Sequence, residues 1–150
     1  MKKALNLSII LLFSLMLSQE TRGAVNDKSL VKLQSWLKSL GKSYSIQQLD
    51  NLKRLELSHK QLKTLPPELG TLKALTYLVL GGNQLKSLPK EIWTLKALTW
   101  LGLDGNQLKS LPPEIGTLKA LPYLDLMRNP LSEKEKIKIR KLLPKCDIRF

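Results

Sequence analysis

A 23-residue repeat constrains the fold of this chain more than any other feature. LTYLVLGGNQLKSLPKEIWTLKA, residues 75–97, is followed by LTWLGLDGNQLKSLPPEIGTLKA, residues 98–120, which differs from it at five positions. Segments that begin LKRLELSHKQL at residue 52 and LPYLDLMRNPL at residue 121 keep the same spacing. Self-similarity at such a period is typical of a chain that stacks one structural unit on the next, so we expect an array of coils.

The leucines inside one repeat follow neither a helical nor a simple strand rhythm. Leu78 and Leu80 lie two residues apart and share one face of a short strand, while Tyr77 and Val79 take the other face. The remaining apolar residues occur at irregular intervals, as expected if the chain then turns and returns along a second wall. One coil buries too few side chains to offset the entropy of ordering its backbone, so stability must come from stacking.

Asparagine and proline mark the turns of each unit. Asn83, Asn106 and Asn129 fall where the strand ends, and an amide there can satisfy turn backbone groups that the sheet does not reach. The first repeat has Lys60 at this position, so we expect a looser first turn. Prolines at one point of each tail restrict the preceding leucine to extended geometry and predict turns or short 3₁₀ segments; they are Pro66, Pro89 and Pro112.

The pattern LxxLxLxxNxL, with tails such as KSLPPEIGTLKA, resembles the leucine-rich repeat family over roughly residues 43–131. The resemblance implies an α/β solenoid: a right-handed coil with short parallel β-strands on the concave face, turns or 3₁₀ segments on the convex face, and helical N- and C-terminal caps. The LPxEIGxLKAL form and the KLLPKCDIRF ending are similar to small exported leucine-rich-repeat proteins of spirochaetes. That similarity implies contact with host or envelope proteins.

The sequence predicts four parts. They are a signal peptide (1–23), an N-terminal helical cap with a half repeat (24–51), the repeats (52–131, starting at 52, 75, 98 and 121) and a C-terminal helix with a short strand (132–150). Asn26 or Asp27 would cap the first helix, and Ser132 with Glu135 has capping-box spacing before the second. Cys146 is expected on the inward side of the closing strand, as a small buried hydrophobe.

The segment 1–23 has the form of a cleaved export signal. Two lysines precede a 14-residue apolar run, Ala4–Leu17, and small residues allow a cut after Gly23. A bilayer span takes about 20 residues, so an uncleaved anchor is the less favoured alternative. Cleavage would lower the net charge from +13 to +11 and leave the protein secreted, on the cell surface or in the periplasm.

The sequence offers no constellation for catalysis. His59 and Cys146 are single residues at opposite ends of the array, and no phosphate-loop or metal-ligand spacing occurs. Asp104 and Asp125 come from adjacent coils, but two isolated carboxylates do not indicate hydrolysis or calcium binding. We therefore expect no enzyme activity, no cofactor, no metal and no small-molecule substrate.

Residues that alternate with the strand leucines face the open side of the sheet and fall into columns that follow the repeat period. Bulky rings in such a column are typical of binding sites, because aromatics and arginine dominate interface energetics. The alternative is that the rings only support one another across the strands. Small Gly81 and Gly102 alongside would leave a shallow groove. The expected partner-binding residues are Arg54, Tyr77, Trp100, Tyr123, Glu56, Val79, Asp104, Asp125 and Met127. Trp93, on a tail, is expected to pack locally.

Lysines form two further columns, Lys63, Lys86 and Lys109 after the strands and Lys73, Lys96 and Lys119 in the tails. They predict either a polyanion site, for an acidic glycan or an anionic membrane surface, or a solvated basic surface. Export and the lack of a groove-reading motif argue against nucleic acid. We expect a protein partner, from the host or the envelope, and a monomer; a structural envelope component without a dedicated ligand is the remaining alternative.

Overall fold

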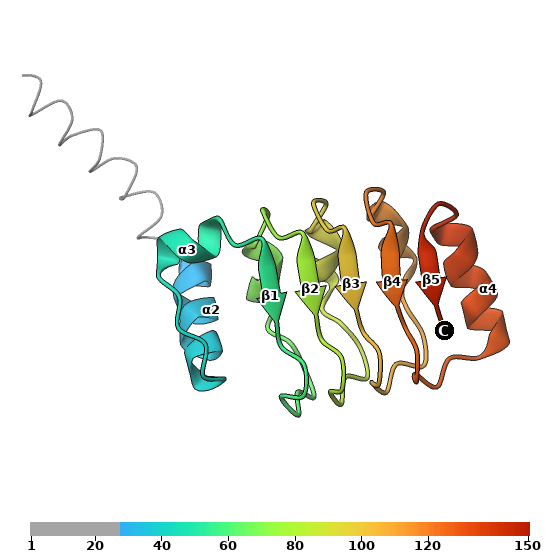
Figure 1. The fold of residues 1–150 in the computed structure, drawn as a ribbon, viewed down its shortest axis with the longest axis horizontal. Helices are drawn as coiled ribbons and strands as arrows, with labels where there is room; N and C mark the ends of the chain where they lie inside the picture. The colour runs from blue at the N-terminus through green and yellow to red at the C-terminus, as the bar shows by residue number, and fades with distance from the viewer. Residues whose placement is uncertain (1–27) are drawn as a thin grey trace, which may run out of the picture.

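The computed structural model describes residues 28–150, in which five short strands stand side by side between helical caps (Figure 1). The expected signal peptide and the candidate caps Asn26 and Asp27 lie outside this range. In chain order the elements are α2 (Lys28–Ser39), α3 (Ile46–Asp50), β1 (Arg54–Glu56), η1 (Pro67–Thr71), β2 (Tyr77–Val79), η2 (Lys90–Thr94), β3 (Trp100–Gly102), η3 (Pro113–Thr117), β4 (Tyr123–Asp125), α4 (Glu133–Leu142) and β5 (Asp147–Arg149).

The strands form one parallel sheet in the order β1-β2-β3-β4-β5. From β1 to β4 every residue pairs with its equivalent in the next repeat, as in Leu55 with Leu78. The last pairing joins Tyr123 to Asp147 and so advances one position beyond the repeat period. The fold is thus a leucine-rich-repeat solenoid with strands on one wall and 3₁₀ helices on the other, as the sequence predicts (Figure 1).

Leucine layers fill the space between the two walls. Leu55, Leu78, Leu101 and Leu124, at the centres of successive strands, are at most 1% exposed, and the tail residues Leu69, Ile92 and Ile115 are fully buried opposite them. Each of the three 3₁₀ helices follows a proline with extended backbone, with φ of −71° at Pro66, −65° at Pro89 and −72° at Pro112. Proline therefore sets the point at which each coil turns into the second wall.

The asparagines form a ladder between coils. Asn83 Oδ1 accepts hydrogen bonds from the backbone N–H groups of Lys60 and Leu62 in the preceding coil, and its Nδ2 donates to Leu57 O and Leu80 O. Asn106 and Asn129 repeat this arrangement one and two coils further on. Each amide thus forms hydrogen bonds with backbone groups of the preceding coil. Lys60 has no such coil before it, and its side chain is exposed.

The N-terminal cap is built from two helices. α2 buries Leu30, Leu33 and Leu37, and Lys32 Nζ lies 3.7 Å from Glu68 on η1. The expected half repeat contains α3, a short α-helix instead of the 3₁₀ helix of the later tails. A capping box stabilises the start of α3. In it, Ser45 Oγ accepts from Gln48 N while Gln48 Oε1 accepts from Ser45 N.

The C-terminal cap differs from the sequence prediction in two details. Ser132 Oγ accepts from Glu135 N, but the Glu135 carboxylate accepts from Leu111 N of the third tail, at 2.9 Å, and from Lys138 Nζ. It therefore joins α4 to the last full coil instead of completing a capping box. Cys146 is half-buried, not buried, because β5 lies at the end of the sheet. Among residues 28–150, no helix combines the length and the apolar character that a membrane crossing requires.

Candidate binding surface on the concave face

Three aromatic rings stand in line on the open face of the sheet. The Tyr77 and Trp100 ring centroids are 5.9 Å apart and their planes differ by 5°, and the Trp100 and Tyr123 centroids are 5.6 Å apart with a tilt of 37°. The Arg54 guanidinium carbon lies 5.3 Å from the centroid of Tyr77. Parallel pairing in register puts these four residues on adjacent strands, and we call them the aromatic row.

The rings of the aromatic row remain accessible although they touch. Tyr77 is 37% and Tyr123 49% exposed, two of the large apolar side chains that the described residues leave in solvent. The Tyr77 and Trp100 planes are parallel, so these two rings cover part of each other's faces. Each ring of the row also carries a polar group, the phenol O–H of a tyrosine or the indole N–H of Trp100. Within residues 28–150 these three groups have no hydrogen-bond partner, so a ligand can supply one.

Glycines beside the aromatic row let neighbouring side chains lean over the sheet. A side chain at Gly81 would collide with the Asp104 carboxylate, and one at Gly82 with the His59 ring. Gly82 and Gly105 also have positive φ, at 65° and 59°, which glycine adopts without strain. The groove expected over Gly81 is therefore filled by Asp104, and Gly102 is also covered, because a Cβ there would lie 3.3 Å from Val79 Cγ1 and 3.5 Å from Trp100 Nε1.

Acidic and basic groups alternate along this face. Arg128 Nη2 lies 2.8 Å from Asp104 Oδ2, and Arg149 Nη1 lies 3.5 Å from Asp125 Oδ2. Asp125 Oδ1 also accepts from Met127 N. The two carboxylates considered together from sequence are thus each paired with an arginine. This removes them as a shared cation site and gives the face a balanced charge.

The structure brings all nine expected partner-binding residues to one face, and adds four that the sequence columns missed. Asp147 and Arg149 extend the columns onto β5. The sequence columns left them out because the spacing from β4 to β5 is one residue longer than the repeat. The alternation in CDIRF did indicate a strand. His59 and Arg128 form a further column with Gly82 and Gly105, and all four have positive φ. The sequence feature that could have identified this column is the regular spacing of its four positions, one per repeat.

The two lysine columns have different environments. Lys73 Nζ donates to Thr94 Oγ1, and Lys96 Nζ donates to the carbonyls of Trp93 and Thr117, so these two residues of the tail column link successive coils. Lys63, Lys86 and Lys109 are exposed, and within the described part of the chain their ammonium groups make no hydrogen bond or ion pair. We call these three the strand-side lysines.

Groups with chemical reactivity are sparse in the described residues. No three His, Cys, Asp or Glu side chains among residues 28–150 come together as a metal site. Burial and, to a lesser degree, the Asp147 carboxylate raise the pKa of Cys146 to about 11. Such a thiol is protonated at neutral pH and so is a poor nucleophile.

Comparison with known proteins agrees with this geometry. The leucine rich repeat model matches residues 50–108. A solved leucine-rich-repeat protein from Leptospira interrogans is 51% identical, with a TM-score of 0.67 over 70% of this chain. The chain belongs to the leucine-rich repeat family. Solenoids of this kind present extended concave surfaces that can serve for binding.

The chain spans 27% of the length of that Leptospira protein. An internalin from Listeria monocytogenes is 27% identical over 57% of this chain and 31% of its own, with a TM-score of 0.38. No curated protein sequence matches the chain.

Proposed function

We propose that this leucine-rich repeat protein binds another protein through its concave face, with the aromatic row at the centre of contact. The observation that carries the proposal is the exposed, stacked line from Arg54 to Tyr123. The leucine layers already stabilise the solenoid, and solvent-exposed rings contribute little to that. Tyrosine, tryptophan and arginine are also the residues most enriched at interface hot spots.

The ring arrangement favours a polypeptide over a sugar ring as the bound group. Stacking on a flat ligand needs an open aromatic face, but the faces of Tyr77 and Trp100 are directed at each other. The O–H and N–H groups of the row, unpaired within residues 28–150, suit backbone carbonyls and side-chain acceptors. The paired charges at Asp104 and Asp125 would add orientation and selectivity around this centre.

We place this activity outside the cytoplasm, on the basis of the signal-like residues 1–23. A partner on the host or in the bacterial envelope follows from that placement. Comparing the mature N-terminus of protein recovered from culture with residue 24 tests the export step, and an N-terminus that retains Met1 would contradict cleavage.

A triple variant tests the binding surface. Replacing Tyr77, Trp100 and Tyr123 with serine should weaken binding to host or envelope protein fractions by at least tenfold, because hot-spot truncations each cost about 2 kcal/mol or more. The matched control is Val31→Ser with Ile137→Ser, which removes exposed apolar side chains from the two caps. Unchanged binding by the folded triple variant would leave a structural role without a dedicated ligand.

The strand-side lysines support a second candidate, binding of an acidic glycan or anionic membrane surface. Their ammonium groups are exposed and unpaired within the described residues, on coils about 4.8 Å apart. A triple variant should bind heparin more weakly, and its binding should depend less on salt concentration. Its substitutions are Lys63→Ala, Lys86→Ala and Lys109→Ala. Replacing Lys73 and Lys96 is the control, and heparin retention equal to that of the parent protein would remove this candidate.

A further inference from the structure

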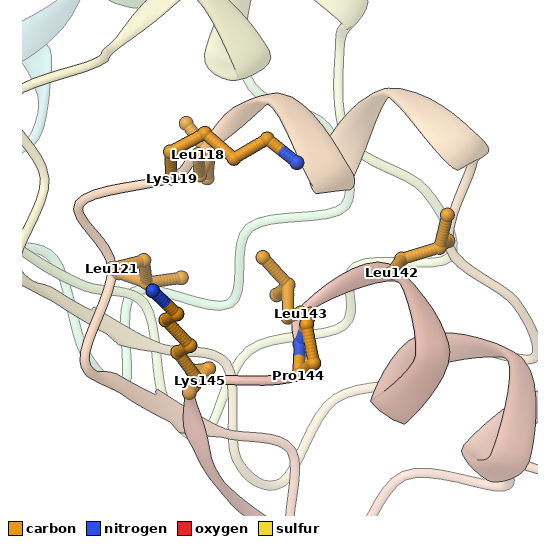
Figure 2. Close-up of a pocket in the computed structure, with 8 residues that line it drawn as sticks. Leu118, Lys119, Leu121, Leu142, Leu143, Pro144 and Lys145 are labelled. Carbon is orange, nitrogen blue, oxygen red and sulfur yellow. The ribbon is translucent and has the colours of Figure 1, made fainter.

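A cavity of about 240 Å³ lies between the last full coil and the C-terminal cap. Leu118, Lys119 and Leu121 form one wall, and the chain from Leu142 to Lys145 forms the other (Figure 2). Cys146 completes the lining. None of these described residues is acidic, and none belongs to the concave face, so the cavity is distinct from the proposed binding surface.

Backbone contacts hold both walls in place. Leu121 N donates to Leu118 O, and Cys146 N donates to Leu143 O, each at 3.1 Å. Asp147 N donates to Pro122 O at 2.7 Å and so ties the cap to the coil at one side of the opening. On the other side, Gly116 lets α4 approach closely, because a Cβ there would already be 3.3 Å from Leu142 O. The cavity is therefore formed before any ligand binds.

The lining combines an apolar interior with two cations. Leucine, proline and cysteine side chains supply the interior, while Lys119 and Lys145 come from opposite walls (Figure 2). Both lysines are exposed, and neither ammonium makes a hydrogen bond or ion pair with the described residues. This arrangement complements a molecule with an alkyl chain and one anionic end.

Two nearby groups disfavour an anion in the cavity. α4 ends at Leu142, so its C-terminal carbonyls contribute a partial negative charge, and the Asp147 carboxylate acts on the Cys146 thiol. Arg140 and Lys141 in the last turn of α4 offset the carbonyls. Asp147 lies on β5 opposite Tyr123, and hence belongs to the concave face. The two lysines remain the charges at the opening.

We propose that this cavity binds a free medium-chain carboxylate, with the alkyl chain among the leucines and the carboxylate between Lys119 and Lys145. Its volume exceeds the ~150 Å³ of an apolar cavity that holds benzene, so it has room for a chain somewhat longer than six carbons. Octanoate is therefore the probe of matching length.

Titration of the ¹⁵N-labelled protein with octanoate tests the proposal. We expect saturable shifts confined to amides of residues 118–121 and 142–146. Octanol should bind more weakly because it lacks the charge, and octylammonium weaker still. Absence of saturation, or equal affinity for octanoate and octylammonium, would overturn the proposal.

Variants separate the charge from the apolar interior. Lys119→Ala with Lys145→Ala should weaken octanoate binding roughly fivefold, as expected for two exposed ion pairs, and leave octanol binding unchanged. Cys146→Met, which extends a side chain into the cavity, should abolish binding of both. The control is Lys38→Ala with Lys53→Ala, which removes the same charge at exposed positions away from the cavity. If the control pair weakens octanoate as much, or Cys146→Met leaves it unchanged, the site is wrong.

Discussion

At the scale of single residues, the asparagine ladder forms hydrogen bonds with turn backbone groups that the short strands do not reach. Each strand is so short that the turn after it has backbone groups beyond the reach of the sheet. Asn106 satisfies Leu85 N of the preceding coil with its oxygen, and the carbonyls of Leu80 and Leu103 with its nitrogen. These groups are buried, so water does not replace the amide.

Removal of this amide should be costly. Asn106→Ala leaves several buried backbone groups unpaired, and we expect it to lower the free energy of unfolding by about 3 kcal/mol, measured by urea denaturation. Gln107→Ala, at an exposed neighbouring position, should change it by less than about 0.5 kcal/mol. Asn129→Ala should cost less than Asn106→Ala, because Asn129 is partly accessible to water. Equal losses at the three positions would contradict this account.

The Cys146 thiol gives a prediction about pH. Its pKa is raised from 9.0 to about 11, so the thiolate population at pH 8 should be about a hundredfold smaller than in the unfolded chain. A thiolate of higher pKa is intrinsically more nucleophilic, which offsets part of this difference, so alkylation by iodoacetamide should be at least about tenfold slower in the native protein than in urea. The ratio should fall as pH rises from 9 toward 11, where the native thiol ionises. Equal rates at pH 8 would show that the cap leaves the thiol in solvent.

At the scale of elements, η2 is the one 3₁₀ helix among residues 28–150 that carries a large side chain at its fourth position. Trp93 stands where η1 has Gly70 and η3 has Gly116, and it is 3% exposed, which agrees with local packing. Its Nε1 is buried without a hydrogen-bond partner in the described part of the chain. Trp93 thus combines apolar burial with an unsatisfied donor.

Two substitutions separate these effects. Trp93→Phe keeps most of the ring and removes the unpaired N–H, whose burial costs about 1–3 kcal/mol, so stability should change by less than about 1 kcal/mol. Trp93→Gly restores the residue of the neighbouring tails but empties the site, and should cost about 3–5 kcal/mol. Thermal and urea unfolding measure both. A phenylalanine variant as unstable as the glycine variant would mean that the indole N–H is satisfied after all.

At the scale of the whole molecule, identical register between strands makes the coils interchangeable. Every pairing from β1 to β4 advances by one repeat period, and each ladder asparagine contacts the coil before it. Deleting residues 75–97 should therefore place β3 beside β1 and leave a folded solenoid that is shorter by one coil. Its stability should fall, since one coil-to-coil interface is lost.

A deletion one residue longer is the matched control. Removing residues 75–98 shifts every later side chain by one position, which turns strand leucines such as Leu101 outward. We expect the first variant to unfold cooperatively and the second to lack a folded state, as measured by circular dichroism and urea denaturation. Comparable folding of both variants would show that register does not determine this fold.

The repeat made much of this structure predictable, and its exceptions mark where prediction stopped. The position of the aromatic row followed from the repeat period because parallel strands in register must align equivalent residues of successive coils. The same rule missed Asp147 and Arg149, since the chain reaches β5 through α4 instead of a tail, and that path is one residue longer. Ser132 and Glu135 had the right spacing for a capping box, but Glu135 found a stronger partner in Leu111 N.

The sequence alone determined the coil, the buried leucines and the open face, because one short pattern copied four times admits a single consistent register. The tertiary structure alone decided how side chains on neighbouring coils meet: that the rings of the row stack, that Asp104 covers Gly81, and that a cavity remains beside Leu121. Those features depend on contacts between residues distant in sequence. Periodicity fixes which residues become neighbours, whereas packing fixes the space that they fill or leave open.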